Sequence, residues 1–427
     1  MDLLAGLRVV SFNHFLAGPL AAQILADLGA DVIALEPPEG AFHRNWAVAN
    51  HFVGGQSVNF LSTGRNKRSL AVDLKSAAGR EVVSRLIGTA DVVMENFRPG
   101  TMERLGFGHE TLRAAHPRLV YAAASGFGSS GPYRDRPGQD LLLQAMSGLA
   151  NRTGRAEGGP TPVGAVIVDQ HAAMIYAMAI LAALVARERT GQGRLVEVNL
   201  FQAALDLQTE ALTAFLNGAR SESPRAPGGI ASWFSAGPYG IYATADGHLA
   251  LSMSPPAAVG RAIGDAALEG VAESEAFTRR EEIARLVTDR LRTQPTAAWL
   301  PGLEREKIWH APVQDYADLP QDPQLEHLGA FATLDGVTGH PVTLVAHPAR
   351  YDGKAPGIRL APQPLGAQTR EILASLARSA PRGRRWSWGL RRRRCGRRSG
   401  SGSPWRARSD RDRHRRRPRR RSPSAAG

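Results

Sequence analysis

Apolar runs and helix-like stretches alternate along the first 125 residues. Short apolar runs at 7–12 and 31–36 flank a helical stretch at 19–30, which carries a proline near its first turn and a glycine near its end. The alternation continues with helical stretches at 76–89 and near 110–115, and with apolar runs at 91–97 and 119–125. Strands that alternate with helices form a mainly parallel sheet covered on both faces. The pattern therefore predicts an α/β fold with a doubly wound, Rossmann-like domain.

Beyond residue 125 the pattern first continues and then changes. Helical stretches at 139–154, 169–190 and 200–217 accompany an apolar run at 195–198, and a Ser/Pro/Gly-rich stretch at 221–229 predicts a linker. Next come two strand-like runs around Asp246-Gly247, which is a strong hairpin signal, and helical stretches near 281–293 and 296–306. A strand around 342–345 and a last helix at 368–377 follow. We expect a large domain over 1–220, a smaller α+β domain over 225–325, and a return to the large domain over 330–378.

The basic charge of the chain is concentrated at its C-terminal end. The formal net charge is +14, but residues 381–427 hold 19 of the 53 basic residues and only two acids. The other 34 basic and 37 acidic residues leave the rest of the chain nearly neutral. The Arg/Gly/Ser-rich composition predicts disorder over 380–427. Arginine blocks attract phosphate, so RNA binding through this tail is one interpretation. We favour an extension without a role and do not expect a nucleic-acid partner.

Several kinds of site lack support in the sequence. The one cysteine, Cys395, lies in the tail, so the rest of the chain has no disulfide, thiolate nucleophile or cysteine metal cluster. The twelve histidines show no metal-binding spacing, and we expect no metal. The first residues lack the basic segment of a signal peptide, and the longest apolar run, 172–186, is shorter than the ~20 residues of a membrane span. We therefore expect a cytoplasmic protein without a membrane partner.

A glycine-rich loop at 126–131 matches G-x-G-x-x-G directly after a predicted strand. In a dinucleotide site this loop opens a helix whose N-terminal amides bind the pyrophosphate. Here two prolines and a glycine follow within 132–138, and they predict an irregular loop instead. The sequence also contains neither a P-loop nor a G-x-S-x-G nucleophile elbow. We therefore expect no nicotinamide or flavin site at this loop.

Asp169 stands between an apolar run at 163–168 and the most hydrophobic helical stretch of the chain. Aspartate is favoured at helix starts, so a helix N-cap is the simplest interpretation. The same position also suits catalysis, because the helix dipole keeps a carboxylate ionised while apolar surroundings remove its water. Such a carboxylate can attack an activated carbonyl and form a covalent intermediate. The two interpretations are compatible, and Asp169 is the candidate nucleophile.

Two basic clusters, at 65–68 and 96–104, stand at expected loop positions beside strands. Ordinary solvated surface explains them without any function. Composition alone favours this interpretation. The alternative is a binding site, in which arginine and lysine neutralise phosphates while Asn96 and nearby amides hydrogen-bond a thioester or carboxylate oxygen. Spacing alone does not decide between the two interpretations.

Distinctive segments are distributed over about 1–378. They include AGP…LADLGADVI at 17–33, NKRS…VDLK at 66–75, ENFRPG at 95–100, RTGQG at 189–193 and YATADG at 242–247. In this combination they resemble the class III coenzyme A transferase family (CaiB/BaiF type), which includes formyl-CoA:oxalate and carnitine CoA-transferases and the α-methylacyl-CoA racemases. The arginine-rich tail has no counterpart in the family.

The resemblance implies a fold, an assembly and a reaction. It implies a Rossmann-like large domain built from both ends of the chain, a small domain from its middle, and a homodimer whose chains interlock like rings. An aspartate at the position of Asp169 attacks an acyl-CoA thioester to give a mixed anhydride. Released coenzyme A converts this anhydride to an aspartyl-CoA thioester, which the acceptor carboxylate attacks. The partners are thus an acyl-CoA and a small carboxylic acid, with the coenzyme A thioester as substrate and no permanently bound cofactor.

The resemblance also implies where the substrate lies. Positions along the coenzyme A groove match Val72, Lys75, Asn96, Phe97, Arg98 and Arg104. Lys75, Arg104 and Arg98 are expected to neutralise the nucleotide phosphates, and Asn96 with neighbouring amides to stabilise an oxyanion. The stretch 137–140, which contains Gly138 and Gln139, is expected to line the reacting end.

Two positions depart from the family pattern. The racemases use a histidine where this sequence has Gln139, and a glutamine side chain is neither a general acid nor a general base at neutral pH. A transferase is therefore preferred, with a 2-methylacyl-CoA racemase or epimerase as the alternative. The glycine-rich lid of some transferases is reduced to Gly228-Gly229, and Trp233 and Phe234 are candidates for shielding the intermediate from water.

Overall fold

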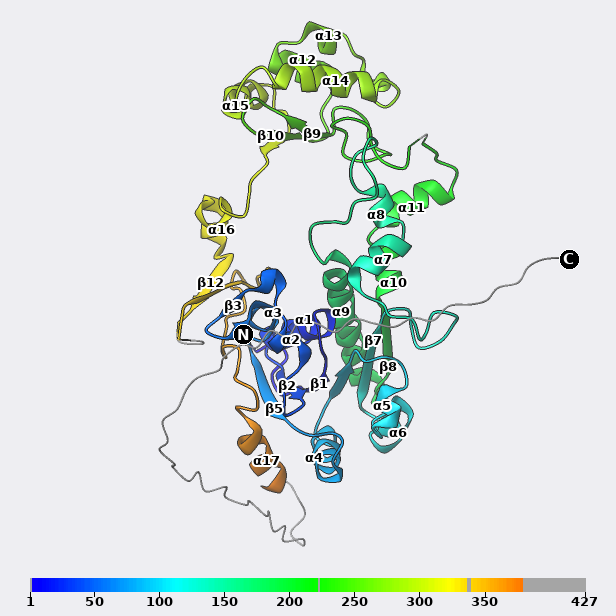
Figure 1. The fold of residues 1–427 in the computed structure, drawn as a ribbon, viewed down its shortest axis with the longest axis vertical. Helices are drawn as coiled ribbons and strands as arrows, with labels where there is room; N and C mark the ends of the chain where they lie inside the picture. The colour runs from blue at the N-terminus through cyan, green and yellow to red at the C-terminus, as the bar shows by residue number, and fades with distance from the viewer. Residues whose placement is uncertain (1, 222, 336–338, 379–427) are drawn as a thin grey trace, which may run out of the picture. The chain divides into compact units, whose positions relative to one another are not determined.

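The computed structural model describes residues 2–221, 223–335 and 339–378. Its main sheet has six strands in the order β5-β2-β1-β6-β7-β8, and all neighbouring strands in it are parallel (Figure 1). The strands are β1 (Arg8–Phe12), β2 (Asp31–Glu36), β5 (Lys67–Ala71), β6 (Val92–Glu95), β7 (Val120–Ser125) and β8 (Leu195–Asn199). The predicted α/β, Rossmann-like architecture is confirmed. The strand order reverses between β1 and β6, which makes the gap between their carboxyl ends the topological switch point.

Helices cover both faces of this sheet. On one face, α1 (Ala17–Asp27) and α9 (Ile167–Thr190) pack their alanine-rich sides against valines of β1, β2, β6 and β7. On the other face lie α4 (Ala77–Ile87), α5 (Thr101–Arg104), α6 (His109–Ala115) and the last helix, α17 (Thr369–Arg378). Because successive strand residues point to opposite faces, strands covered on both sides are apolar throughout, which is the pattern seen in the sequence.

The long helix α9 belongs to this core. Among the described residues, α9 alone is long and apolar enough to meet the length and composition of a membrane span. Nine of its residues are nevertheless buried in the protein, from Val168 to Arg187, and most of them contact the sheet. The prediction of a buried helix is therefore confirmed for one face of α9 only, because Met174, Met178 and Val185 on its other side are exposed.

Residues 226–308 contribute a second hydrophobic core. Its antiparallel sheet contains β9 (Gly240–Ala243), β10 (His248–Leu251) and β11 (His310–Pro312), and the first two form the hairpin predicted at Asp246-Gly247. Its helices are α12 (Pro256–Ile263), α13 (Ala266–Glu269), α14 (Arg280–Leu291) and α15 (Thr296–Arg305). The stretch predicted as a linker is partly packed here, because Ala226 is 3% exposed.

Shorter elements complete the described chain. They are α2 (Phe42–Asn45), β3 (Phe52–Val53), β4 (Gln56–Ser57), α3 (Val58–Thr63), α7 (Asp140–Met146), α8 (Leu149–Arg152), α10 (Leu200–Asp206), α11 (Thr209–Leu216), α16 (Pro323–Leu328), β12 (Phe331–Leu334) and β13 (Val342–Val345). The helix predicted over 139–154 is divided into α7 and α8. Gly148 separates them with a φ of 84°, a left-handed conformation that glycine adopts readily.

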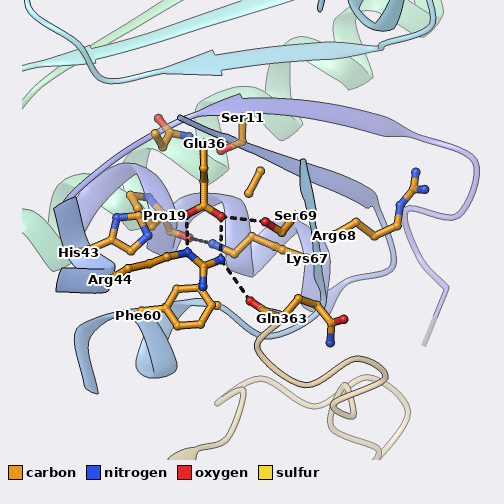
Figure 2. A pocket seen from close by; sticks show the side chains of 13 residues that line it. Ser11, Pro19, Glu36, His43, Arg44, Phe60, Lys67, Arg68, Ser69 and Gln363 are labelled. Carbon is orange, nitrogen blue, oxygen red and sulfur yellow. Dashed lines mark hydrogen bonds and ion pairs between the residues drawn. The ribbon is translucent and has the colours of Figure 1, made fainter. Parts of the chain in front are cut away.

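A hollow lined mostly by polar residues lies beside β2 and β5. The strand β5 itself was not predicted from the sequence. Glu36, Arg44 and Lys67 are among the residues that line the hollow (Figure 2). Arg44 donates to both oxygens of Glu36, with Nη2 2.7 Å from Oε1. Lys67 Nζ donates to the Pro19 carbonyl at 2.9 Å, and burial lowers the pKa of Lys67 to about 7.

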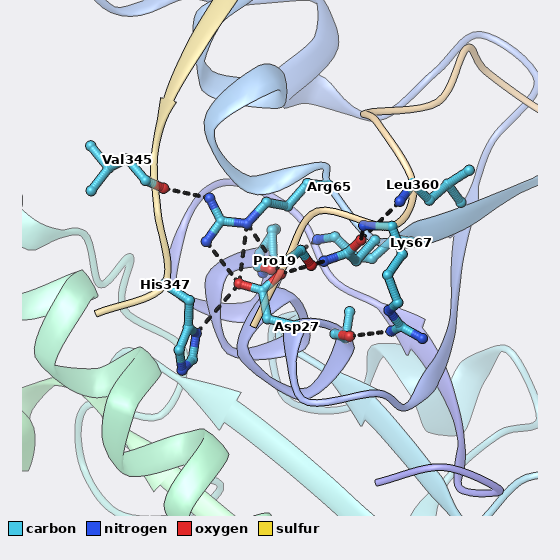
Figure 3. A network of polar contacts seen from close by, with 11 residues as sticks. Pro19, Asp27, Arg65, Lys67, Val345, His347 and Leu360 are labelled. Atoms are coloured by element: carbon cyan, nitrogen blue, oxygen red, sulfur yellow. Dashed lines mark hydrogen bonds and ion pairs between the residues drawn. The ribbon is translucent and has the colours of Figure 1, made fainter. Parts of the chain in front are cut away.

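Hydrogen bonds join the segment around 345–360 to the residues just before β5 (Figure 3). The Asn66 N–H donates to the Leu360 carbonyl at 2.7 Å, and the Arg65 guanidinium donates to Asp27 at 2.7 Å and to the Val345 carbonyl. Arg65, Asn66 and Lys67 are only 4%, 6% and 7% exposed. Neither interpretation of this basic cluster is therefore correct at these three positions, which are buried and committed to the fold.

Candidate active site

The residues after β1 and β6 meet at the topological switch point. Asn96 Oδ1 accepts the His14 N–H at 2.8 Å, and Asn96 Nδ2 donates to the His14 carbonyl at 2.8 Å. The Phe97 ring stacks on the His14 ring with centroids 5.2 Å apart. Burial lowers the pKa of His14 to about 4, so this imidazole is neutral at physiological pH. Ligands of open parallel sheets bind at such crevices, which favours the position predicted for Asn96 and Phe97.

The amides expected to stabilise an oxyanion are partly committed to the fold. The Phe97 N–H donates to Glu95 Oε2 at 2.8 Å, and one Asn96 Nδ2 hydrogen is used on His14. Asn96 thus joins the ends of β1 and β6, and its second amide hydrogen is the one left to face a ligand.

Asp169 lies in the first turn of α9. The helix begins at Ile167, so Asp169 is its third residue and the prediction of an N-cap is wrong. The capping oxygen comes from α7 instead: Asp140 Oδ1 accepts the N–H groups of Val168 at 2.8 Å and Asp169 at 3.2 Å. Among the described residues, no hydrogen bond reaches the carboxylate of Asp169, which is half-buried.

The environment of Asp169 favours its neutral form. Burial, and secondly the negative charge of Asp140, raise the pKa of Asp169 to about 7. The expected effect of the helix dipole is outweighed, because the Asp140 carboxylate already occupies the first amides of α9. Asp169 therefore changes charge near neutral pH, as suits a reactive carboxylate.

The segment before α7 supports this arrangement. Gly138 packs so closely on Gly126 that an added Cβ on Gly138 would lie 2.4 Å from the Gly126 Cα. Gln144 Nε2 donates to Asp140 Oδ2 at 2.6 Å and Gln144 Oε1 accepts the Val163 N–H at 2.9 Å, which joins α7 to the segment before α9. No helix begins at the glycine-rich loop 126–131, and Gln139 is exposed.

The predicted phosphate ligands lie beyond the carboxyl ends of β5 and β6. Lys75, Arg98 and Arg104 are exposed, and Arg104 Nη2 donates to Thr101 Oγ1 at 2.9 Å. Val72 is buried and its N–H donates to the Glu36 carbonyl at 2.9 Å. The strands β2 and β1 separate the residues that follow β5 from those that follow β6. None of the predicted site residues lines the hollow of Figure 2.

Comparison with known proteins identifies the family. Residues 4–369 match the sequence model of CoA-transferase family III. The chain belongs to this family. It is 33% identical to an acyl-CoA transferase of Fusarium pseudograminearum over 88% of this chain and 85% of that protein. It is 32% identical to the succinate–glutarate CoA-transferase of Agrobacterium fabrum over 87% of this chain and 95% of that protein.

A solved structure agrees with this assignment. A CAIB/BAIF family protein from Brucella suis has a TM-score of 0.77 and 29% identity, over 88% of this chain and 99% of that one. The family predicted from the sequence is therefore confirmed, and the protein is an acyl-CoA:carboxylate CoA-transferase that uses coenzyme A thioesters as substrates.

Two further residues of this CoA-transferase were not predicted from the sequence: Tyr176 on α9 and Glu95 at the end of β6. The Tyr176 hydroxyl contacts the backbone of Glu95, and the Glu95 carboxyl holds the Phe97 N–H. A signal was present, since Tyr176 is the single tyrosine in an alanine-rich helix and a buried hydroxyl needs a polar partner.

Two other expectations concern the aromatic residues proposed to shield the intermediate from water and the absence of a metal site. Trp233 is 5% exposed and its ring packs against Phe234 with centroids 5.5 Å apart, so its side chain is part of the protein interior. Gly229 packs closely under the Tyr242 ring. Within residues 2–221, 223–335 and 339–378, no group of three or more His, Cys, Asp or Glu side chains could hold a metal ion. The tail expected to be disordered lies outside the described residues.

Proposed function

We propose that this CoA-transferase works through covalent intermediates on Asp169. The ionised carboxylate attacks the thioester carbonyl of the donor, the C–S bond breaks, and an acyl-aspartyl anhydride and coenzyme A thiolate result. The thiolate attacks the aspartyl carbonyl and releases the donor acid, which leaves an aspartyl-CoA thioester. The acceptor carboxylate displaces the thiolate from this thioester, and the thiolate then attacks the acceptor carbonyl. The acceptor leaves as its coenzyme A thioester and Asp169 is regenerated.

One observation carries this proposal: Asp169 is a half-buried carboxylate whose backbone is fixed while its side-chain oxygens have no partner among the described residues. Asp140 performs the structural capping role and leaves Asp169 available for chemistry. A pKa of about 7 makes the ionised form accessible at neutral pH while the carboxylate remains poorly solvated and reactive.

Coenzyme A would lie along the carboxyl edge of the sheet. The exposed cations Lys75, Arg98 and Arg104 suit its phosphates, and Asn96 and Phe97 at the switch point suit its pantetheine arm. Gly138 and Gln139 directly precede Asp140, which contacts the nucleophile helix, so they suit the reacting end.

Racemisation finds less support in the geometry. His171 is the nearest histidine to Asp169 in sequence, and its Nε2 lies 2.7 Å from Asp206 Oδ2. Two residues along a helix correspond to a rotation of about 200°, so His171 and Asp169 project from opposite sides of α9. Among the described residues, no acid–base side chain is hydrogen-bonded to Asp169, whereas the family's racemases have a histidine in place of Gln139.

We also propose that the enzyme is a homodimer, as the family resemblance implies. Met174, Met178 and Val185 are 54%, 62% and 61% exposed and lie along one side of α9, opposite its buried face. Met178→Asp should weaken the dimer in analytical ultracentrifugation, because it places a charge in this apolar stripe. The control Met253→Asp alters a methionine that is 73% exposed outside α9 and should leave the assembly unchanged. Equal sedimentation of Met178→Asp and wild type would show that this side of α9 does not form the dimer interface.

A donor and acceptor panel tests the catalytic proposal. Wild-type protein, Asp169→Asn and the control Asp206→Asn are each given acyl-CoA donors and carboxylic acids, and the acyl-CoA products are measured by mass spectrometry. Asp206 is an exposed aspartate on the adjacent α10, so the control makes the same chemical change outside the site. We expect Asp206→Asn to retain transfer and Asp169→Asn to lose at least about 1,000-fold in kcat. Normal transfer by Asp169→Asn would refute the proposal.

A further inference from the structure

Tyr176 connects the nucleophile helix to the strand that leads into the crevice. It is 1% exposed and lies seven residues after Asp169 on α9, which places both side chains on the same side of the helix about two turns apart. The Tyr176 hydroxyl oxygen accepts the Glu95 N–H at 3.3 Å. Its hydrogen lies between two backbone acceptors, the Ala122 carbonyl at 2.5 Å and the Glu95 carbonyl at 3.0 Å. A single hydroxyl therefore joins α9 to the end of β6 and to the middle of β7.

The contact continues into the crevice through Glu95. Glu95 is the last residue of β6, and its Oε2 accepts the Phe97 N–H at 2.8 Å, which fixes the turn that carries Asn96 and Phe97. Asn96 in turn holds the His14 backbone through two hydrogen bonds of 2.8 Å. One sequence of polar contacts thus leads from the nucleophile helix through Tyr176 and Glu95 to the residues at the switch point.

The apolar contacts of α9 with the sheet provide little directional restraint. They are made chiefly by Ala173, Ala177, Ile180 and Ala183, whose apolar surfaces pack closely but have no preferred bonding direction. Hydrogen bonds weaken steeply as their geometry departs from the optimum. Arg187, toward the C-terminal end of α9, also makes a directional contact, because its Nη1 donates to Asp91 Oδ1 at 2.9 Å just before β6 begins. The Tyr176 hydroxyl contacts the opposite end of β6, beside the crevice, and lies 11 residues closer to Asp169 along α9. It is therefore the polar contact best placed to fix α9 relative to the carboxyl end of β6.

We propose that Tyr176 is a positioning residue that holds Asp169 at attack distance from a thioester bound at the Asn96–Phe97 turn. This inference rests on the proposed function, in which Asp169 is the nucleophile. A reacting pair must approach to about 3–3.5 Å, and a misplacement of 1 Å reduces the rate by about 100-fold. The helix carries one member of the pair and the β6 turn anchors the other, so a restraint between helix and turn acts on the chemical step more than on binding.

Tyr176→Phe removes the hydroxyl and retains the ring, and Tyr242→Phe is its matched control. Tyr242 is 1% exposed and its hydroxyl also donates to a backbone carbonyl, that of Pro238 at 2.8 Å, but it lies in the second core. We expect Tyr176→Phe to lower kcat by about 5- to 20-fold while KM for acyl-CoA stays within about 2-fold of wild type. The single-turnover rate of adduct formation on Asp169, followed by mass spectrometry, should fall by the same factor. Tyr242→Phe should change neither rate.

The outcomes separate this proposal from the proposed function. An unchanged kcat and adduct rate in folded Tyr176→Phe overturn the positioning role, and so does an equal loss in Tyr242→Phe, which would indicate a general loss of stability. Wild-type protein that transfers coenzyme A without an adduct on Asp169 refutes the proposed function itself.

A second pair of variants covers the case in which Tyr176→Phe does not fold. Glu95→Gln retains an oxygen that accepts the Phe97 N–H, whereas Glu95→Leu removes it and releases the turn. The proposal expects a lower kcat for Glu95→Leu than for Glu95→Gln. Equal kcat values for the two variants overturn it.

Discussion

Buried carboxylates in the two halves of the large sheet have opposite electrostatic character. Beside β2 and β5, burial would raise the pKa of Asp27 and Glu36, but hydrogen bonds from His347 and Arg65 to Asp27, and from Arg44 to Glu36, hold both pKa values below their usual range. Beside β6 and α9, burial raises the pKa of Asp169 to about 7 and that of Glu95 to about 8, and no cation of the described part of the chain counteracts this rise. Asp27 and Glu36 are therefore paired with cations, whereas Asp169 and Glu95 have no cation partner among the described residues.

This difference separates structural from chemical roles. A buried carboxylate that an arginine neutralises is permanently ionised and serves to fix segments, as Asp27 does where the segment around 345–360 returns to the sheet. A buried carboxylate without a cation is costly to ionise and stays available to react. The presence of a cation partner thus distinguishes a carboxylate that fixes the chain on one side of the sheet from a candidate nucleophile on the other.

The largest effect on stability is expected from breaking a paired charge. Arg65→Met leaves Asp27 buried without its guanidinium partner and should reduce the free energy of unfolding by about 3–5 kcal/mol in urea denaturation. The control Arg68→Met breaks a pair whose side chains are 21% and 33% exposed, and it should cost less than about 1 kcal/mol. Similar losses for both variants would show that burial does not distinguish these pairs.

Removing the unpaired charge of Asp169 should stabilise the protein, whereas breaking a paired charge destabilises it. The pKa of Asp169 is about 7 in the folded protein, whereas its ordinary value is 3.8, so the folded protein retains a proton that the unfolded chain loses between these pH values. Stability therefore falls as the pH rises from about 4 to about 7, and the full cost of the buried charge is present above pH 7. Asp169→Asn should raise Tm by a few degrees at pH 8 and by progressively less toward pH 4. A lower Tm at pH 8 would contradict an unpaired, destabilising Asp169.

A smaller effect sharpens the account of Asp169. Because Asp169 must be ionised to attack, kcat/KM should rise with pH around an apparent pKa near 7. Asp140→Asn removes the neighbouring negative charge while its side-chain oxygen still caps α9, so this inflection should move to lower pH. An inflection that stays in place, with kcat/KM otherwise retained, would show that the charge of Asp140 does not act on the nucleophile.

The sequence predicted the parallel sheet well because its strands are continuous apolar runs between amphipathic helices. It missed β5, where Lys67, Arg68 and Ser69 resemble a solvated loop, because their buried partners Glu36 and Pro19 are distant in the chain. Asp169 was correctly placed at the start of a helix, but its capping role belongs to Asp140, 29 residues earlier. Contacts over such separations have no local pattern, and this is also why the link from Tyr176 to Glu95 was missed.

The most direct test of the central claim is a trap for the intermediate. Wild-type protein is mixed with a competent acyl-CoA donor, quenched and treated with hydroxylamine, which converts an activated aspartyl carbonyl to a hydroxamate, and the peptides are mapped by mass spectrometry. We expect the hydroxamate on Asp169, in proportion to the donor consumed, and none on Asp140 or Asp206. Full transfer activity with an unmodified Asp169 at every time point would contradict it.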